Sequence, residues 1–235
     1  MFSSNIKMMK NKILIISAHP DDEVLGCGGT VAKHSLNGER VEQIFVSDGE
    51  SARDKISIKN KQKTINSRLH AAKKAAKILG IKNTTSINFP DNRLDSIPLL
   101  EIVKELEKKI SQFKPSIIYT HSDLDLNIDH QIVSRAVMTA CRPINNLSVK
   151  EIYFFEVLSS SEWVHKSKES FLPNYFVDIS KTINLKIKAL KSYKKEIKKY
   201  PHSRSIEGIK VLSQYRGMMV GVKNAESFFM KRKIN

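Results

Sequence analysis

The sequence has few of the features that mark secreted or membrane-embedded proteins. Its 235 residues include only two cysteines, Cys27 and Cys141, so at most one disulfide can form and a disulfide-stabilised scaffold is excluded. No apolar run approaches the roughly 20 residues of a membrane-spanning helix. The run Ile13–Ile16, behind a lysine-bearing N-terminus, is too short for the core of a signal peptide. We therefore expect a cytoplasmic protein without a stable membrane anchor, in which both thiols are reduced and packed.

Acidic residues are also scarce, with 24 aspartates and glutamates against 40 lysines and arginines, and the formal net charge is +16. Such a charge is typical either of a protein with an anionic partner or of a lysine-rich composition. The most basic stretch, Lys181–Lys199, contains eight lysines and one acid, Glu196. Its apolar residues recur at helical spacing, which predicts a helix with one buried face and one solvated basic face. No basic patch is interleaved with aromatic residues that stack on bases, so we expect no nucleic-acid partner.

Strand and helix patterns alternate along the chain, which predicts a doubly wound, mostly parallel α/β sheet flanked by helices, of the Rossmann-like class. We expect a single domain over residues 1–235. Within it, residues 151–235 form a C-terminal extension packed on the main sheet, with two strands, the basic helix and a C-terminal helix. The expected strands are Ile13–Ser17, Gln43–Ser47, Ser86–Phe89, Ser116–His121, Glu151–Val157 and Tyr175–Ile179. The expected helices before the extension are Asp22–Leu36, Thr64–Leu79, Leu99–Ile110 and His130–Cys141.

The first polar cluster, His19-Pro20-Asp21-Asp22-Glu23, follows the strand Ile13–Ser17. Open α/β sheets place their active sites at the carboxyl ends of such strands. One imidazole and three acids crowded at this point are costly unless something compensates them, and a bound divalent metal is the commonest compensation. The imidazole and one carboxylate can then be ligands, which leaves a second carboxylate to act as a base.

The second polar cluster, His121–His130, follows the strand Ser116–Thr120 and therefore lies at the same edge of the sheet. His130 begins a helix whose apolar residues face the sheet, so its imidazole can point back to the strand ends. Asp129 can hold an imidazole in one tautomer, as carboxylates behind metal ligands do. Two histidines and one acid with an open fourth position are typical of a catalytic zinc.

Each of these side chains also has a purely structural interpretation. His19 can be a hydrogen-bonded histidine at a strand end, Asp21 and Asp22 can cap the next helix, and His130 can be a first-turn residue. Their coincidence at two strand ends favours the metal interpretation. The glycines after Asp22 come too late after the strand, and lack the spacing, for a dinucleotide-binding loop.

Two of these motifs carry a family resemblance. Ala18–Glu23 resembles the signature of the LmbE-like, or PIG-L, family of zinc-dependent N-acetylglucosaminyl deacetylases, and Asn127–His130 resembles the second metal motif of that family. Similarities extend over most of the chain and support the resemblance. They are found in Ser47–Glu50, Arg68–Gly80, Pro90–Asp91 and Ala225–Phe228.

The resemblance implies a specific set of site residues. It implies one zinc ion per subunit held by His19, Asp22 and His130, with Asp21 as the general base. It further implies substrate contacts, for which the candidates are Arg68, Asp91 and His121.

The chain departs from the family pattern at one position. Many members have a histidine three residues before the last metal ligand, where this chain has Asn127. Asn127 can donate a hydrogen bond to an oxyanion but carries no positive charge. His121 and His202 are the candidates for the missing imidazole. In some oligomeric relatives a C-terminal histidine enters a neighbouring subunit, so His202 acting in a homo-oligomer is one alternative.

We therefore expect a hydrolase that uses a metal to remove an N-acetyl group from a small amino sugar, with or without a phosphate or nucleotide on the sugar. The alternatives are a two-metal phosphoesterase, a nucleotide-sugar transferase on a similar fold, and a basic binding module without activity. The phosphoesterase needs more converging acids, and the candidates are Asp48, Asp91 and Asp125. The binding module leaves both polar clusters unexplained.

Overall fold

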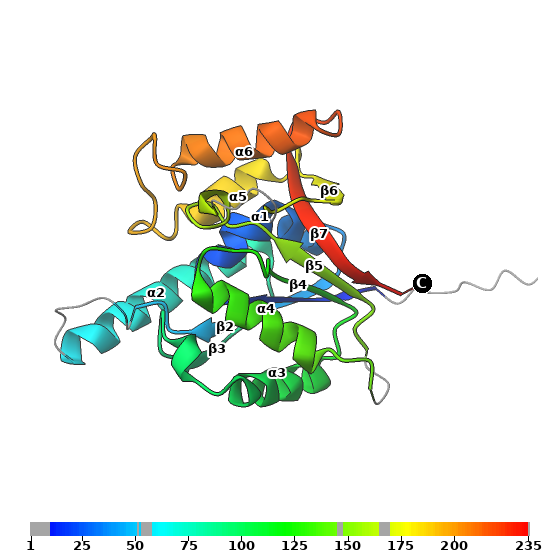
Figure 1. Ribbon diagram of the computed structural model, residues 1–235. Coiled ribbons are helices and arrows are strands. Elements are labelled where there is room, and N and C mark those ends of the chain that lie inside the picture. The colour runs from blue at the N-terminus through cyan, green and yellow to red at the C-terminus, as the bar shows by residue number, and fades with distance from the viewer. Residues whose placement is uncertain (1–9, 51, 53–57, 145–147, 165–169, 235) are drawn as a thin grey trace, which may run out of the picture.

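A computed structural model describes residues 10–50, 52, 58–144, 148–164 and 170–234. In this part of the chain one seven-stranded sheet has the order β3-β2-β1-β4-β5-β7-β6 (Figure 1). Neighbouring strands from β3 to β5 pair in parallel, and β7 is antiparallel to both β5 and β6. The predicted mostly parallel α/β sheet is confirmed. The strands are β1 Lys12–Ser17, β2 Arg40–Ser47, β3 Asn83–Phe89, β4 Ile117–His121, β5 Glu151–Phe155, β6 Tyr175–Asp178 and β7 Ala225–Lys233.

Helices cover both faces of the sheet (Figure 1). One apolar core unites one face of the sheet with α1, α2, α5 and α6, and a second core unites the other face with α3 and α4. No helix in the described residues has the length and apolar character needed to cross a membrane. The helices are α1 Asp22–Leu36, α2 Ile58–Leu79, α3 Leu99–Phe113, α4 Ile128–Ala140, α5 Ile183–Leu190 and α6 Ile206–Met218, with short 3₁₀ turns at Leu94–Ser96 and Ser161–Trp163.

The strand β1 shows why its sequence is continuously apolar. Ile13 and Ile15 belong to the core under α1, whereas Leu14 and Ile16 belong to the core under α3 and α4. Successive side chains of a strand point to opposite faces, so a central strand covered on both faces has no position for a polar residue. The first polar side chains therefore come where β1 ends, beside the ends of β2 and β4.

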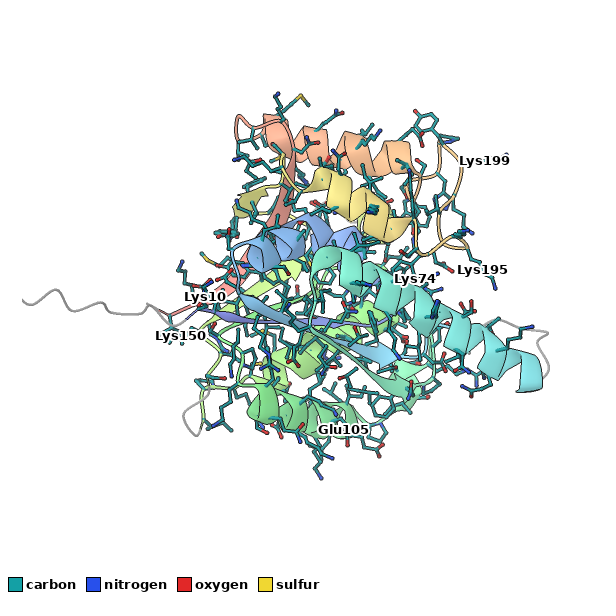
Figure 2. All side chains as sticks on the ribbon, turned by 180° about the vertical axis from the view of Figure 1, so that it is seen from behind. Lys10, Lys74, Glu105, Lys150, Lys195 and Lys199 are labelled. Carbon is teal, nitrogen blue, oxygen red and sulfur yellow. The ribbon has the colours of Figure 1, made fainter. Side chains whose placement is uncertain are left out.

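All six predicted strands are present, with bounds that differ by up to three residues at either end. The predicted C-terminal helix is α6. The strand β7 was not predicted, and the prediction of a basic helix over residues 181–199 was wrong beyond Leu190, where α5 ends. After Leu190 the chain runs through turns, in which the Tyr193 hydroxyl donates to Glu23 at 2.6 Å and Glu196 lies 2.6 Å from Arg68. The helical spacing of the sequence does not reveal these tertiary contacts. Lys195 and Lys199 project from this segment into solvent, as predicted for the basic face (Figure 2).

A buried ion pair connects the extension to the start of α1. The helix is interrupted at Cys27, which has non-helical dihedral angles. The interruption releases backbone groups on either side, and Lys186 and Glu226 bind them. Lys186 Nζ donates to the Leu25 carbonyl at 2.7 Å and to Glu226 Oε1 at 2.6 Å. Glu226 also accepts the amides of Gly29 and Thr30 at 2.9 and 2.7 Å.

Candidate metal centre and active site

The two predicted clusters lie side by side at the carboxyl edge of the sheet. The strand β1 pairs with β2 on one side and with β4 on the other, so the strand order changes direction here. Such a switch point leaves a crevice outside the strand ends, where α/β proteins bind ligands. The turn after β1 presents His19, Asp21 and Asp22, and the first turn of α4 presents His130.

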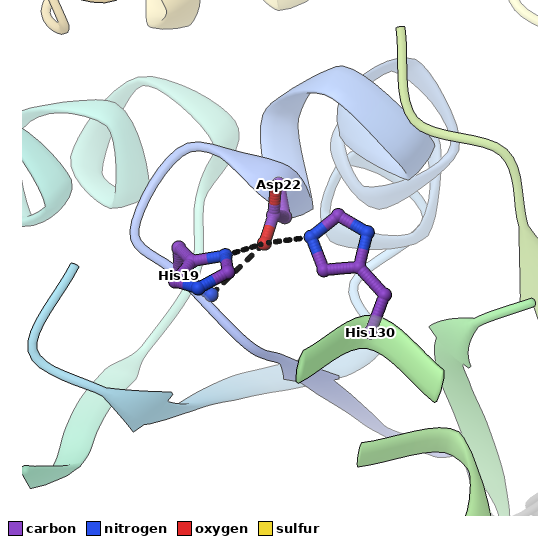
Figure 3. Close-up of side chains that lie close together, drawn as sticks. All are labelled: His19, Asp22 and His130. Atoms are coloured by element: carbon purple, nitrogen blue, oxygen red, sulfur yellow. Dashed lines mark hydrogen bonds and ion pairs between the residues drawn. The ribbon is translucent and has the colours of Figure 1, made fainter. Parts of the chain in front are cut away.

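His19, Asp22 and His130 converge on one point (Figure 3). His19 Nδ1 lies 3.2 Å and His130 Nε2 lies 3.3 Å from the same carboxylate oxygen, Asp22 Oδ2. One ligand atom from each of the three residues lies within 4.8 Å of the others, and all three residues are buried. This is the predicted ligand set, assembled from two elements that are far apart in the sequence.

The donor set fits a divalent cation. Asp22 Oδ1 and His130 Nε2 are buried without a hydrogen bond to any described residue, which is costly unless a further group binds them. Burial opposes the charge on Asp22, but His130 and His19 outweigh it and hold its pKa well below the usual range. A charged carboxylate beside two imidazoles is the chemistry that zinc prefers.

Asp129 orients His19. His19 Nε2 lies 3.1 Å from Asp129 Oδ2 and 3.0 Å from Asp91 Oδ1, on the opposite side of the ring from Asp22. The Asp129 carboxylate also accepts the amides of Asn92 and Leu94 at 2.8 and 3.1 Å. It therefore holds the His19 ring with Nδ1 toward Asp22. Asp129 was expected to hold an imidazole, and the ring it holds is that of His19.

Asp125 orients His130, a role that the sequence analysis did not assign. His130 Nδ1 lies 3.1 Å from Asp125 Oδ1, and the Asp125 carboxylate accepts the hydroxyls of Ser160 and Ser161. These contacts outweigh burial and lower the pKa of Asp125 to about 2, whereas Asp22 and Asp125 outweigh burial and raise the pKa of His130 to about 9. The position of Asp125 in the second cluster was a usable signal, but nothing local in the sequence connects the two serines to it.

Asp21 is fully buried and makes no capping hydrogen bond to α1, so the capping interpretation has no support at this residue. Each of its oxygens faces one guanidinium: Arg68 Nη2 lies 3.1 Å from Oδ1 and Arg204 Nη1 lies 3.1 Å from Oδ2. Burial raises the pKa of Asp21, and both arginines oppose that shift. Arg68 passes close to Gly49, where a Cβ would lie 3.1 Å from its Nε and 2.8 Å from Pro20, so only glycine leaves room.

The three residues considered for oxyanion stabilisation have different positions. Asn127 is the N-cap of α4, where its side chain accepts the Asp129 amide at 2.8 Å, and it is only partly buried. His121 is fully buried, and its Nε2 accepts the Ala18 amide at 2.8 Å. Its ring stacks on that of His130 with centroids 3.9 Å apart, and burial and the neighbouring His130 hold the pKa of His121 well below its usual range.

His202 lies in the segment between α5 and α6. Its ring centroid is 6.0 Å from that of Trp163, and its Nδ1 accepts the Arg204 amide at 3.1 Å. The group that this segment brings to Asp21 within one chain is therefore Arg204. Arg204 lies two residues after His202 and was not among the predicted site residues.

A cavity of about 330 Å³ lies beside Arg68, between α2 and residues 192–196. This is a volume at the lower end for small-molecule sites. Its walls combine the buried Arg68 and Glu196 with basic side chains at the rim. Those basic residues are His70, Lys74, Lys194 and Lys195.

Comparisons with known proteins agree with this geometry. Residues 14–141, more than half of the chain, match the PIG-L family, described as GlcNAc-PI de-N-acetylase. The chain is 31% identical over 188 residues to the uncharacterized deacetylase YaiS of Escherichia coli (strain K12), covering 77% of this chain and 90% of the relative. It is 26% identical over 232 residues to the diacetylchitobiose deacetylase of Thermococcus kodakarensis, covering 92% of this chain and 81% of the relative.

Among solved structures, the chain resembles GalB, the 4-carboxy-2-hydroxymuconate hydratase of Pseudomonas putida KT2440. The TM-score is 0.72 at 21% identity, with 97% of this chain and 98% of that chain covered. This likeness concerns the fold alone, and the fold therefore also serves a hydratase. The assignment to a family must come from the sequence match and the motifs. Both agree with the resemblance found in the sequence, and the chain belongs to the PIG-L family of deacetylases.

Proposed function

We propose that the protein is a zinc-dependent hydrolase that removes the acetyl group from an N-acetylated amino sugar or its conjugate. The observation that carries this proposal is the convergence of His19, Asp22 and His130 at the sheet edge, beside the buried carboxylate of Asp21. Three ligands that leave a coordination position open are typical of a catalytic metal site. The family match supports deacetylation as the reaction at this site.

In this proposal His19, Asp22 and His130 hold the ion. A bound divalent ion supplies polarisation of the amide carbonyl and a lower pKa for water, from about 15.7 toward 7. Asp129 and Asp125 keep the two imidazoles aimed at the site, each by binding the ring nitrogen that faces away from Asp22. The three ligands therefore need little reorganisation when an ion binds.

Asp21 is the proposed general base. It takes a proton from the attacking water, whose oxygen adds to the carbonyl carbon of the acetamide. The carbon–nitrogen bond then breaks, acetate leaves, and Asp21 returns the proton to the amine of the sugar. A positioned general base typically contributes 10²–10⁴-fold to the rate. Its burial keeps bulk water from competing for the carboxylate.

Asn127 and His202 are the proposed donors to the oxyanion that develops on the carbonyl oxygen. Asn127 Nδ2 lies 3.4 Å from Asn92 Oδ1, a weak contact that a substrate oxygen can replace. For His202 we keep the proposal that it acts in a neighbouring subunit. Mixing His202→Ala protein with inactive Asp21→Asn protein tests this, because hybrid oligomers regain activity only if the residue acts between chains.

The substrate is proposed to be a small amino sugar with a negatively charged substituent. The Thermococcus relative is named as a diacetylchitobiose deacetylase. Here the cavity beside Arg68 carries three lysines at its rim, which favours a phosphate or carboxylate on the sugar. Arg68 reaches Asp21 from the side of that cavity, and Asp91, which follows β3, reaches His19. Both are therefore the proposed contacts for the sugar itself.

The test combines metal analysis with acetate release. The purified protein is analysed for metal, stripped with a chelator, and reloaded with one zinc ion per chain. Acetate is then measured with N-acetylglucosamine, its 6-phosphate and N,N'-diacetylchitobiose. We expect one zinc per chain, zinc-dependent acetate release, and loss of the ion in His19→Ala and His130→Ala proteins that remain folded. Two bound metals with phosphate release would favour the phosphoesterase, and full metal occupancy in both variants would overturn the ligand assignment.

A further inference from the structure

Arg204 enters the site from a part of the chain far from the metal motifs. It lies 183 positions after Asp21, between the turn segment that follows α5 and the first turn of α6. Its side chain is 20% exposed, whereas the Asp21 side chain that it contacts is fully buried. The guanidinium donates two hydrogen bonds: Nη1 donates to Asp21 Oδ2 at 3.1 Å, and Nε donates to the Leu158 carbonyl at 3.3 Å.

Four charged side chains form a closed ring around this contact. Arg68 links Asp21 Oδ1 at 3.1 Å to Glu196 Oε1 at 2.6 Å, and Arg204 links Asp21 Oδ2 at 3.1 Å to Glu196 Oε2 at 3.7 Å. Arg68 Nη1 also lies 3.3 Å from Oε1 of the buried Glu50, so two cations are shared by three carboxylates. Removing one cation leaves buried carboxylates that the remaining cation cannot satisfy alone.

The backbone at Asp21 adds a second, independent observation. Its φ angle is 132°, a region that residues with a side chain rarely adopt. Such a conformation persists only where surrounding contacts determine it. The Asp21 amide is held by Glu23 Oε2 at 2.9 Å, and the side chain is held by one guanidinium on each oxygen. The strained backbone therefore points the Asp21 carboxylate toward Arg68 and Arg204. These two side chains come from distant parts of the chain and fix its position.

We propose that Arg204 is a positioning residue, which holds the carboxylate of Asp21 in the orientation that proton transfer requires. This inference rests on the proposed function, because it assigns Arg204 a part in the reaction that Asp21 carries out. Arg204 acts through Asp21 and has no contact with His19, Asp22 or His130 among the described interactions. Arginine suits this position because its planar fork reaches Asp21 and the Leu158 carbonyl together, which the single ammonium of lysine cannot do.

The experiment compares Arg204→Ala and Arg204→Lys with the wild-type protein and with Arg216→Ala. Arg216 is a matched control, because it makes a two-bond ion pair with Glu156 at 2.8 and 2.7 Å in the same part of the chain, away from Asp21. Zinc content, kcat and KM are measured with N-acetylglucosamine, its 6-phosphate and N,N'-diacetylchitobiose, with and without added guanidinium chloride at low concentration.

For Arg204→Ala we expect kcat to fall roughly 10–100-fold, the size of loss that a misplacement near 1 Å causes, with KM changed less than about threefold and one zinc still bound. Guanidinium restores part of kcat in Arg204→Ala, and Arg204→Lys is intermediate. Arg216→Ala keeps wild-type kcat even if it unfolds at a lower urea concentration. Wild-type kcat in Arg204→Ala, or an equal loss of kcat in Arg216→Ala, would overturn the proposal.

A second measurement needs no turnover. Urea unfolding of Arg204→Ala, Asp21→Asn and the double variant forms a thermodynamic cycle. If Arg204 holds Asp21, Arg204→Ala lowers the urea midpoint of unfolding much less in the Asp21→Asn background than in the wild-type protein. Strictly additive losses would overturn the contact. Absence of acetate release by the wild-type protein is a different failure: it would overturn the proposed function, while the cycle still decides whether Arg204 holds Asp21.

Discussion

The ion pair between Lys186 and Glu226 gives the sharpest stability prediction. Both side chains are at most 6% exposed, and together they bind the backbone groups that the break at Cys27 releases from α1. We expect Lys186→Met to destabilise the protein by about 3–5 kcal/mol, the usual cost of leaving one buried charge of a pair without its partner. In a chain of this size each kcal/mol corresponds to about 2–4 °C, so the melting temperature falls by roughly 6–20 °C.

The size of this effect comes from what remains after the substitution. Glu226 keeps the amides of Gly29 and Thr30 but loses its counter-charge, and the Leu25 carbonyl loses its donor. The double variant Lys186→Met/Glu226→Gln removes both charges and keeps an amide oxygen as acceptor. Because neutral replacement of a buried ion pair is often tolerated, we expect the double variant to be more stable than Lys186→Met alone.

Urea unfolding followed by circular dichroism provides the measurement. Lys188→Met is the matched control, because Lys188 is on the same helix but exposed, and substitutions there fall within about 0.5 kcal/mol. A free energy of unfolding of Lys186→Met within about 1 kcal/mol of the wild-type value would contradict the predicted role of the ion pair. A double variant that is no more stable than the single one would contradict it as well.

Two further predictions concern the metal site and the thiols. Asp125→Asn removes the charge behind His130, so zinc affinity, measured by competition with a chelator, is expected to fall roughly 10–100-fold. The exposed Asp123→Asn is its control and leaves affinity unchanged, and equal affinities in both variants would contradict the role of Asp125. Burial raises the pKa of Cys141 to about 12 and that of Cys27 well above its usual value, so neither thiol is expected to react with Ellman's reagent at pH 8 before unfolding. Rapid labelling of the native protein would show that the packing around them is wrong.

The convergence of His19, Asp22 and His130 was predictable because each residue is marked by local sequence. His19 and Asp22 follow a fully apolar strand, and His130 begins an apolar-periodic helix after another. A single physical rule, that polar residues gather where buried parallel strands end, is enough to bring them to one edge. The order of the strands was not needed beyond the expectation that β1 and β4 are close neighbours.

The contacts behind these three residues were not predictable in the same way. Ser160, Ser161 and Arg204 reach the site through tertiary packing, and the residues next to them in sequence carry no corresponding pattern. The strand β7 is similar, because its second half alternates between exposed and partly buried positions and its pairing partners are distant in sequence. Local sequence patterns indicate which face of an element is buried, whereas the elements that pair with it or pack on it depend on the rest of the chain.

The extension of residues 151–235 contributes side chains to the site. We propose that the whole chain unfolds as one unit. The family match ends at residue 141, yet Ser160 contacts Asp125 and Arg204 contacts Asp21. Glu196 contacts Arg68, which itself contacts Asp21. The single tryptophan, Trp163, lies in the extension and reports on it by fluorescence, whereas circular dichroism reports on the whole chain. We expect the two urea transitions to coincide, as they do for one cooperative domain. An earlier fluorescence transition would show that the extension separates first, and the ion pair of Lys186 would then be too weak to join the two parts.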